Sequence, residues 1–191
     1  MTTWSRQRSL AKESLGVLLE LLEDDAVSDR RLVLGYLEAK RSLAKAFEAH
    51  AVEKYADSSV MEAVIRSLTH VMRMSYPQVE DRYLRVVGFG RVHELLLAYM
   101  VPRAGLDIPS DELRMLTGDA IHTERRARDL RDLGFKLEAF DGTLGPTYKL
   151  NEAIPDLDVG AASLIRRNIR NDKAIDNSTK QRLLAEAGLP A

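Results

Sequence analysis

The first half of the chain repeats hydrophobic residues every three or four positions, the spacing that puts them on one side of an α-helix. After one such segment comes the acidic sequence EDDAVSD, and a second segment follows it. A third begins at Ser59, where SVME has the form of a capping box, and ends before Pro77, which cannot donate to a helix. The pattern predicts a bundle of three amphipathic helices over residues 1–87. The first stripe consists of Ala11, Leu15, Leu18 and Leu22.

The pattern changes after Gly88. RVHELLLAYM and DELRMLT predict two short helices, and a third is expected from Ile121 to Leu133. Gly118 and Gly134 follow the second and third helices and supply the left-handed conformation of many helix ends. KLEAF and TYKL, separated by the turn-forming DGTLGP, predict a two-stranded hairpin. This order of elements is that of a winged helix-turn-helix domain, which we place at residues 88–150.

The remaining residues, 151–191, predict a loop over NEAIPDLDVG and then two short helices, the second capped by Asn177 or Ser178. The expected fold class is therefore mainly α. It combines an N-terminal helical bundle, a winged helix-turn-helix domain with a small β-hairpin wing, and a helical C-terminal extension.

Composition narrows the possible functions. The longest uninterrupted apolar run, LLLAYMV, is far shorter than the roughly 20 residues that cross a bilayer, and the amino terminus lacks the apolar core of a secretory signal. We therefore expect a cytoplasmic protein that does not bind membranes. The chain has no cysteine, and its four histidines lack metal-binding spacing, so no metal site is expected. The sequence predicts no cofactor and no catalytic residue, because ExK at Glu38 and PD at Pro155 lack the strand context of a nuclease.

The third predicted helix of the winged domain carries four arginines within seven residues. Ala127 and Leu130 share the side that would pack on the preceding helices. The opposite side is available to DNA, where arginine can bond guanine bidentately and other polar side chains can contact base edges. The predicted base-reading residues are His122, Arg125, Arg126 and Asp129. The predicted phosphate contacts are Thr123, Arg128, Arg131, Lys136 and Lys149, together with Arg166, Arg167 and Arg170 in the C-terminal extension.

A second interpretation of these charges is purely structural. Arginine is a good helix former, and Glu124 or Asp129 could pair with it on the surface. The cluster in the C-terminal extension could equally be a solvated helix face. Residues 86–150 contain nine lysines and arginines against ten acidic residues, and the whole chain has a net charge of −1. Any contact with DNA is therefore expected to be local, and Asp141 at the tip of the predicted wing disfavours contact with the minor groove.

The segments RVHELLLAYM, PSDELRMLTG and IHTERRARDLRDLGFKLEAF, closed by YKL, resemble the winged-helix region of bacterial HNH-type restriction endonucleases. The resemblance covers about 60 residues. It implies that the run RRxRxLRxxGF joins a recognition helix to the first wing strand. STKQRLLAEAG is similar to the helix that leads into the nuclease module of those enzymes, but the zinc knuckle and the HNH histidine do not follow it in this sequence. The resemblance thus implies a recognition portion without its nuclease.

These observations predict sequence-specific binding of double-stranded DNA, as part of a restriction endonuclease or a related defence protein. We expect a homodimer formed through the N-terminal helices, so that two winged domains reach two half-sites. Two alternatives remain open at this point. A dimeric transcriptional regulator would use the same domain together with a ligand pocket, and a protein-interaction module would use the winged helix as a connector.

Overall fold

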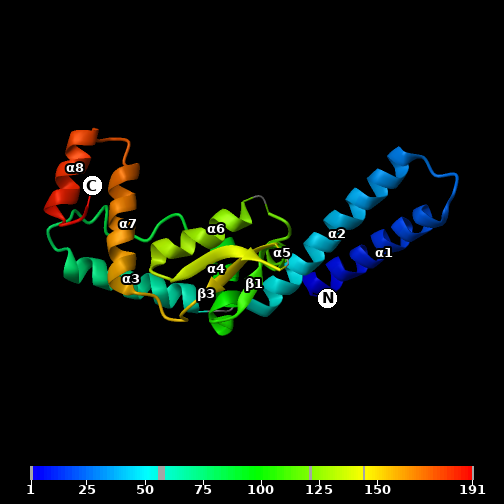
Figure 1. Cartoon of the computed structure of the whole chain (residues 1–191), viewed down its shortest axis with the longest axis horizontal. Coiled ribbons are helices and arrows are strands. Elements are labelled where there is room, and N and C mark those ends of the chain that lie inside the picture. Colours follow the sequence, from blue (N-terminus) through cyan, green and yellow to red (C-terminus); the bar gives the residue numbers. More distant parts are fainter. Residues whose placement is uncertain (1, 56–58, 121, 144, 191) are drawn as a thin grey trace. The chain divides into compact units, whose positions relative to one another are not determined.

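The structure is a computed structural model in which the chain is mainly helical (Figure 1). Among the residues that it describes, there are eight α-helices and one three-stranded antiparallel sheet. None of the described helices is both long enough and apolar enough to cross a bilayer. The described residues are 2–55, 59–120, 122–143 and 145–190.

The internal contacts divide the chain into two compact units, and the chain passes from one unit to the other three times. The first unit consists of Met1–Asp57 and Asp111–Thr123, and the second of Ser58–Ser110 and Glu124–Ala191.

In the first unit, α1 (Thr3–Glu23) and α2 (Asp29–Tyr55) form a hairpin. Thr2 begins α1 as its N-cap, because its hydroxyl accepts a hydrogen bond of 3.2 Å from the Ser5 amide. The two helices contact each other through small side chains, and the hydroxyl oxygens of Ser14 and Ser42 lie 2.9 Å apart. The two helices of the hairpin therefore approach each other closely, and few large side chains lie between them.

The second segment of this unit contains most of α5 (Ser110–Leu116) and the turn after it. Gly118 has a φ of +62°, the left-handed conformation predicted for the end of this helix. The hydroxyls of Thr117 and Thr123 are 2.7 Å apart and buried, and Thr123 also donates to the Ala120 carbonyl at 2.8 Å. These bonds close the turn between α5 and the start of α6.

In the second unit, α3 packs against α7 and α4. Its hydrophobic stripe includes Leu68 and Met72, and α7 contributes Leu164 and Ile165; all four side chains are fully buried. The stripe predicted from the sequence is therefore correct, whereas its partner differs from the expected one. The predicted bundle grouped α3 with the two helices before it, but its contacts place it with the helices that follow. The helices of this unit are α3 (Val60–Ser75), α4 (Arg91–Met100), α7 (Leu157–Asn171) and α8 (Asn177–Glu186).

The sheet of the second unit has the strand order β1-β3-β2. Strands β2 (Leu137–Gly142) and β3 (Gly145–Leu150) form the predicted hairpin, with Leu137 opposite Leu150. Strand β1 (Asp107–Pro109) pairs with the other edge of β3 and was not predicted. Three residues ending in proline give too short a pattern for strand prediction, and Pro109 is tolerated because it lies at an edge.

The helix predicted from Ile121 to Leu133 is shorter and changes type. It consists of α6 (Thr123–Asp129) followed by a 3₁₀ turn at Leu130–Leu133, and Ile121 lies outside the described residues. Another 3₁₀ turn, Val101–Arg103, follows α4. Gly134, with a φ of +88°, ends the tightened turn as predicted. The four arginines thus belong to about two turns of α-helix and one of 3₁₀-helix.

The predicted helix caps need three corrections. The Ser59 side chain makes no capping hydrogen bond, so the SVME capping box is absent. α7 starts inside the segment predicted to be a loop, because Asp156 accepts a hydrogen bond from the Val159 amide. α8 is capped by Asp176, which accepts from the Thr179 amide at 2.7 Å, rather than by Asn177 or Ser178. In the last two cases an aspartate supplies the capping oxygen.

Gly134 gives a test of this packing. A methyl group there would overlap the Asp156 carbonyl and approach the Gly160 amide, whereas one at Gly105, which has a similar positive φ of +85°, would meet open space. We expect Gly134→Ala to lower the free energy of unfolding by at least about 3 kcal/mol, and Gly105→Ala by about 1 kcal/mol. Urea denaturation of both variants measures the difference. Equal losses would show that α7 does not pack closely on the turn at Gly134.

Candidate nucleic-acid interface

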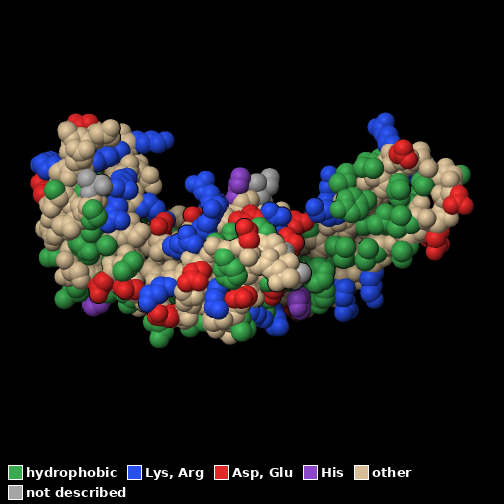
Figure 2. All heavy atoms as spheres, in the orientation of Figure 1, with side chains coloured by type: hydrophobic (Ala, Val, Ile, Leu, Met, Phe, Trp, Pro, Cys, Tyr) green, Lys and Arg blue, Asp and Glu red, His purple; other side chains and the backbone are tan. Residues whose placement is uncertain are grey.

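The exposed side of α6 carries three of the predicted DNA contacts. Arg125, Arg126 and Arg128 are exposed, while Ala127 and the following Leu130 have no exposed surface. A stripe of small and branched residues therefore holds the helix against the interior, and the guanidinium groups project outward. Figure 2 shows Lys and Arg side chains on this part of the molecule, with Asp and Glu side chains beside them.

A buried histidine fixes α6 on α4. His93 is only 2% exposed, and its Nε2 atom lies 3.3 Å from Oδ2 of Asp129. The Gly90 amide donates to Nδ1 at 3.1 Å, so Nδ1 is an acceptor and the proton of the neutral ring is on Nε2, directed at the carboxylate. Asp129 also lies 3.8 Å from Nη1 of Arg126. The carboxylate of Asp129 thus links a buried ring to an exposed arginine of the same site.

The connection before α4 is held against α7 by side chains of α7. Arg167 donates to the Val87 carbonyl and stacks over the Phe89 ring at 4.7 Å. Asn168 donates to the backbone carbonyls of Tyr83 and Arg85 at 2.9 and 2.8 Å. The sequence predicted only a connection over residues 79–87, yet four contacts give it a defined position.

This connection, α6, the turn after it and α7 enclose a polar groove of about 610 Å³. Each of its three carboxylates has a partner: Asp129 as described, Asp132 with Arg167 at 2.9 Å, and Asp172 with the Tyr83 hydroxyl at 2.8 Å. The groove is lined by Arg82, Tyr83, Arg85, Val87, Gly88, Arg125, Asp129, Asp132, Arg167, Asn168, Asn171 and Asp172.

The hydrogen bond between Tyr83 and Asp172 has a clear electrostatic effect. Burial and this bond raise the pKa of Tyr83 to about 12, so the phenol stays protonated and continues to donate. The Ala174 amide and the Tyr83 hydroxyl lower the pKa of Asp172. Arg82 lies 3.5 Å from the same carboxylate and 4.6 Å above the Tyr83 ring. Asp172 is consequently ionised and fully engaged within the protein.

Two arginines in the groove differ from the others. Within the part of the chain that the structure describes, the side chains of Arg85 and Arg125 have no hydrogen-bond or ion-pair partner. Both are exposed. Since the carboxylates of the groove are already bonded, these two guanidinium groups are free to bind an anion from solution. Arg128, on the exposed side of α6, likewise has no hydrogen-bond or ion-pair partner among the described residues.

The other predicted contacts occupy different environments. Thr123 is a correction, because its side chain is fully buried and its hydroxyl bonds Thr117 and Ala120. His122 is exposed but precedes α6, with a φ of +68°. Arg131 donates from Nε to the Leu137 carbonyl and so supports β2. Asp129 is engaged with His93, which gives it a positioning role and leaves it poorly placed to read a base.

The predicted lysines and the C-terminal arginines are likewise dispersed. Lys136 lies 2.7 Å from Glu152, which raises its pKa, and Lys149 lies 3.3 Å from Asp107, so acidic groups offset both charges. Arg167 belongs to the groove but is already bonded. Arg166 is half-buried, with an Nε atom that lacks a hydrogen-bond partner among the described residues, and Arg170 is exposed.

The sequence interpretation missed Arg82, Arg85 and Asn168, which contribute to the groove. Arg82 and Arg85 occur in the motif RYLR, where two basic residues flank an aromatic one. That local signal was present, but only the fold shows that the motif lies beside α6. Comparison of the chain with protein-family models, with curated proteins and with solved structures finds no match.

His93 predicts a pH dependence of stability. Burial lowers its pKa from 6.5, although Asp129 opposes the shift. Below pH 6.5 the unfolded chain takes up a proton that the folded chain resists, so the stabilisation is complete above 6.5 and declines as the pH falls toward the lowered value. We expect His93→Gln to reduce the loss of unfolding free energy between about pH 7.5 and pH 5.5, measured by urea titration.

Exposed His70 offers a matched control for this measurement. His70→Gln is expected to retain the pH dependence of the natural sequence. An unchanged slope in His93→Gln would mean that the pKa of the ring is the same in the folded and unfolded chain, contrary to the lowering that burial causes.

Proposed function

We propose that the chain binds double-stranded DNA, with α6 as the recognition helix of a winged helix-turn-helix. Of the elements in the predicted domain over residues 88–150, α4 and the β2–β3 hairpin belong to the second unit with most of α6, whereas most of α5 belongs to the first. The observation that carries the proposal is the unequal pairing of charges around α6. Carboxylates in the groove are bonded to protein groups, whereas Arg85, Arg125 and Arg128 have no partner among the described residues. Unpaired guanidinium groups on a helix and in the adjoining groove suit a ligand with regularly spaced phosphates.

The two kinds of arginine are expected to have different tasks. Arg125 and Arg126 are on adjacent exposed positions of α6, and arginine at such a position can bond O6 and N7 of guanine in the major groove. Arg85 and Arg128 are assigned to phosphates. Arg126 is held through Asp129 and His93, which supports its role because an ordered guanidinium loses less entropy when it binds.

A place in a restriction or related defence system is supported by the sequence resemblance of the segment RRxRxLRxxGF and the sequence that follows it. The proposed role is recognition of a DNA site by a winged helix. The second candidate is a protein-interaction module, favoured by the balanced charge of residues 86–150. The two functions differ in their response to salt.

Salt titration separates these functions. If about four phosphates are contacted, the logarithm of the DNA-binding constant should fall with the logarithm of salt concentration at a slope of roughly −3.6. Fluorescence anisotropy with a labelled duplex of random sequence, followed by a selected site, measures this slope. A slope near zero, or no binding to duplexes selected from a random pool, would contradict DNA binding.

Single substitutions test the assignment of residues. Arg125→Ala or Arg126→Ala should weaken binding to the preferred site by on the order of 1–3 kcal/mol and reduce discrimination against altered sites. Arg85→Ala and Arg128→Ala should weaken binding to all sequences alike and make the salt slope less steep by about 1. Binding is measured by anisotropy on preferred and altered duplexes.

The control is Arg73→Ala, which removes an exposed arginine of α3 outside the groove and should leave affinity unchanged. Equal loss on every duplex for Arg125→Ala and Arg126→Ala would contradict base reading. An effect of Arg73→Ala as large as the others would show that the binding surface is not centred on α6.

A further inference from the structure

The α1–α2 hairpin buries its small side chains and exposes its large ones. The residues buried on α2 are all alanines, and α1 buries only Ala11 and Leu21. Close packing reinforces this arrangement, because a side chain at Gly35 would meet Leu21. Alanine contributes little apolar area, so these contacts alone stabilise a two-helix hairpin weakly. Its large hydrophobic residues lie elsewhere.

Six of the large residues share one surface, which we call the hairpin face; Val17, Leu19, Val33 and Leu34 are also exposed but are not part of it. Its members from α1 recur at spacings of three and four, and those from α2 at four and seven, so each set follows one side of its helix. Leu22 is 62% exposed, Tyr36 54% and Phe47 41%. Figure 2 shows hydrophobic side chains spread over this hairpin. The hairpin face consists of Leu15, Leu18, Leu22, Tyr36, Leu43 and Phe47. Five of them line a pocket of about 280 Å³, whose other walls include Asp111, Met115 and Asp119 of the same unit.

The hairpin face combines exposed and partly exposed side chains. Leu22, Tyr36 and Phe47 are exposed, and Leu15, Leu18 and Leu43 are partly exposed. From Leu15 to Leu22 the face covers about 10 Å of α1, and from Tyr36 to Phe47 about 16 Å of α2. Exposed apolar side chains grouped in this way are characteristic of a surface that binds a protein partner.

The charges of α1 indicate which partner fits. Arg6, Arg8 and Lys12 lie in its amino-terminal half, and Glu20 and Glu23 in its carboxyl-terminal half. The first turn contains no acidic residue and the last turn no basic one. This order is unfavourable for the dipole of the helix itself, which prefers acids at the amino end and bases at the carboxyl end. An antiparallel copy of the same helix, in contrast, can bring a basic residue of one helix beside an acidic residue of the other.

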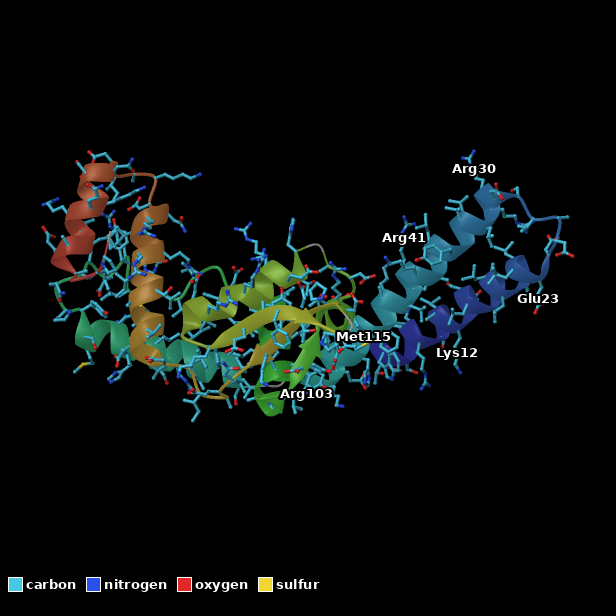
Figure 3. The ribbon with its side chains drawn as sticks, viewed as in Figure 1. Lys12, Glu23, Arg30, Arg41, Arg103 and Met115 are labelled. Carbon is cyan, nitrogen blue, oxygen red and sulfur yellow. The ribbon has the colours of Figure 1, made fainter. Side chains whose placement is uncertain are left out.

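We propose that the hairpin face binds the hairpin face of a second copy of this chain, with the two α1 helices antiparallel about a twofold axis. The assembly is a four-helix arrangement whose apolar layer is supplied equally by both copies. Lys12, near the middle of α1, and Glu23, its last residue, are labelled in Figure 3, and in this arrangement each faces the opposite charge on the partner's α1. This inference specifies the expected homodimer and does not depend on DNA binding.

The first test is the mass of the whole chain in solution without DNA. Light scattering should give twice the 21.4 kDa of one chain. Tyr36→Glu introduces charge into the hairpin face and should weaken dimerisation at least about hundredfold. The matched control is Leu34→Glu, because Leu34 is 57% exposed but is not among the residues of the hairpin face. A monomeric natural sequence, or equal effects of the two variants, would overturn the proposal.

The second test concerns orientation. Lys12→Glu and Glu23→Lys should each weaken the dimer on the order of tenfold, since every exchange places like charges together twice in a symmetric pair. The double variant should regain most of the affinity, because the charges become opposite again. Analytical ultracentrifugation at low and high salt measures these constants. Additive losses in the double variant would overturn the antiparallel order of the α1 helices.

Circular dichroism distinguishes loss of the dimer interface from loss of folding. Each variant should retain the helical signal of the natural chain, and the proposed α6 contacts are untouched. A variant that dimerises poorly but still binds a single DNA site shows loss of the interface alone. Failure of DNA binding in a protein that remains dimeric instead contradicts the proposed function and leaves the interface intact.

Discussion

The proposed site depends on the hydrogen bond from His93 to Asp129. This bond joins α4 to the carboxyl end of α6, and it runs from a buried ring to a carboxylate that is 29% exposed. Burial favours the neutral ring, the Gly90 amide selects its tautomer, and the remaining proton points at the carboxylate. α6 has only seven residues and would be unstable alone, so its orientation comes from such tertiary bonds and from the buried Ala127.

The other carboxylates of the groove also accept hydrogen bonds that join elements of the second unit. Asp132 accepts from Ser163 and Arg167, and Asp172 accepts from Tyr83. Each bond fastens one element of the second unit to another and also removes a negative charge from competition for the nearby arginines. A near-neutral chain can therefore present a locally positive surface. Net charge describes solubility and long-range attraction, whereas the availability of individual charges is decided by such pairing.

The local structure of several elements was predictable from the sequence, whereas the elements against which they pack were not. The stripe of α3, Gly134 after the 3₁₀ turn and the β2–β3 hairpin follow from spacing and turn chemistry, which act over a few residues. The stripe predicted for α1 was wrong in part, because Leu22 is 62% exposed and the helix buries Leu21 instead. On α2 the buried residues are alanines, and Phe47 of the predicted stripe is exposed. The assignment of α3 to α7 depends on shape matching between segments about 90 residues apart in the chain. Strand β1 exists because β3 offers an edge to it, and three residues carry no period of their own.

In the candidate site, too, some features follow from sequence patterns and others depend on contacts between distant segments. Exposure of Arg125, Arg126 and Arg128 follows from helical periodicity once Ala127 is placed inside. Thr123 has the same periodicity as Ala127, and its burial could have been inferred; assigning it to phosphate disregarded that rule. The roles of Arg85 and Asn168 could not be inferred, because they arise where a connection meets α7. The short range of sequence patterns thus explains which contacts were missed.

The α1–α2 hairpin of the first unit is only weakly stabilised by its own contacts. A hairpin held by alanines and serines gains little from burial, and α1 additionally opposes its own dipole. Such a sequence is a poor solution for an isolated pair of helices. In the proposed dimer, a second copy would cover the large side chains and bring opposite charges beside those of α1. The contribution of burial would then grow and the charges of α1 would gain partners, while their interaction with the dipole of their own helix would stay unfavourable.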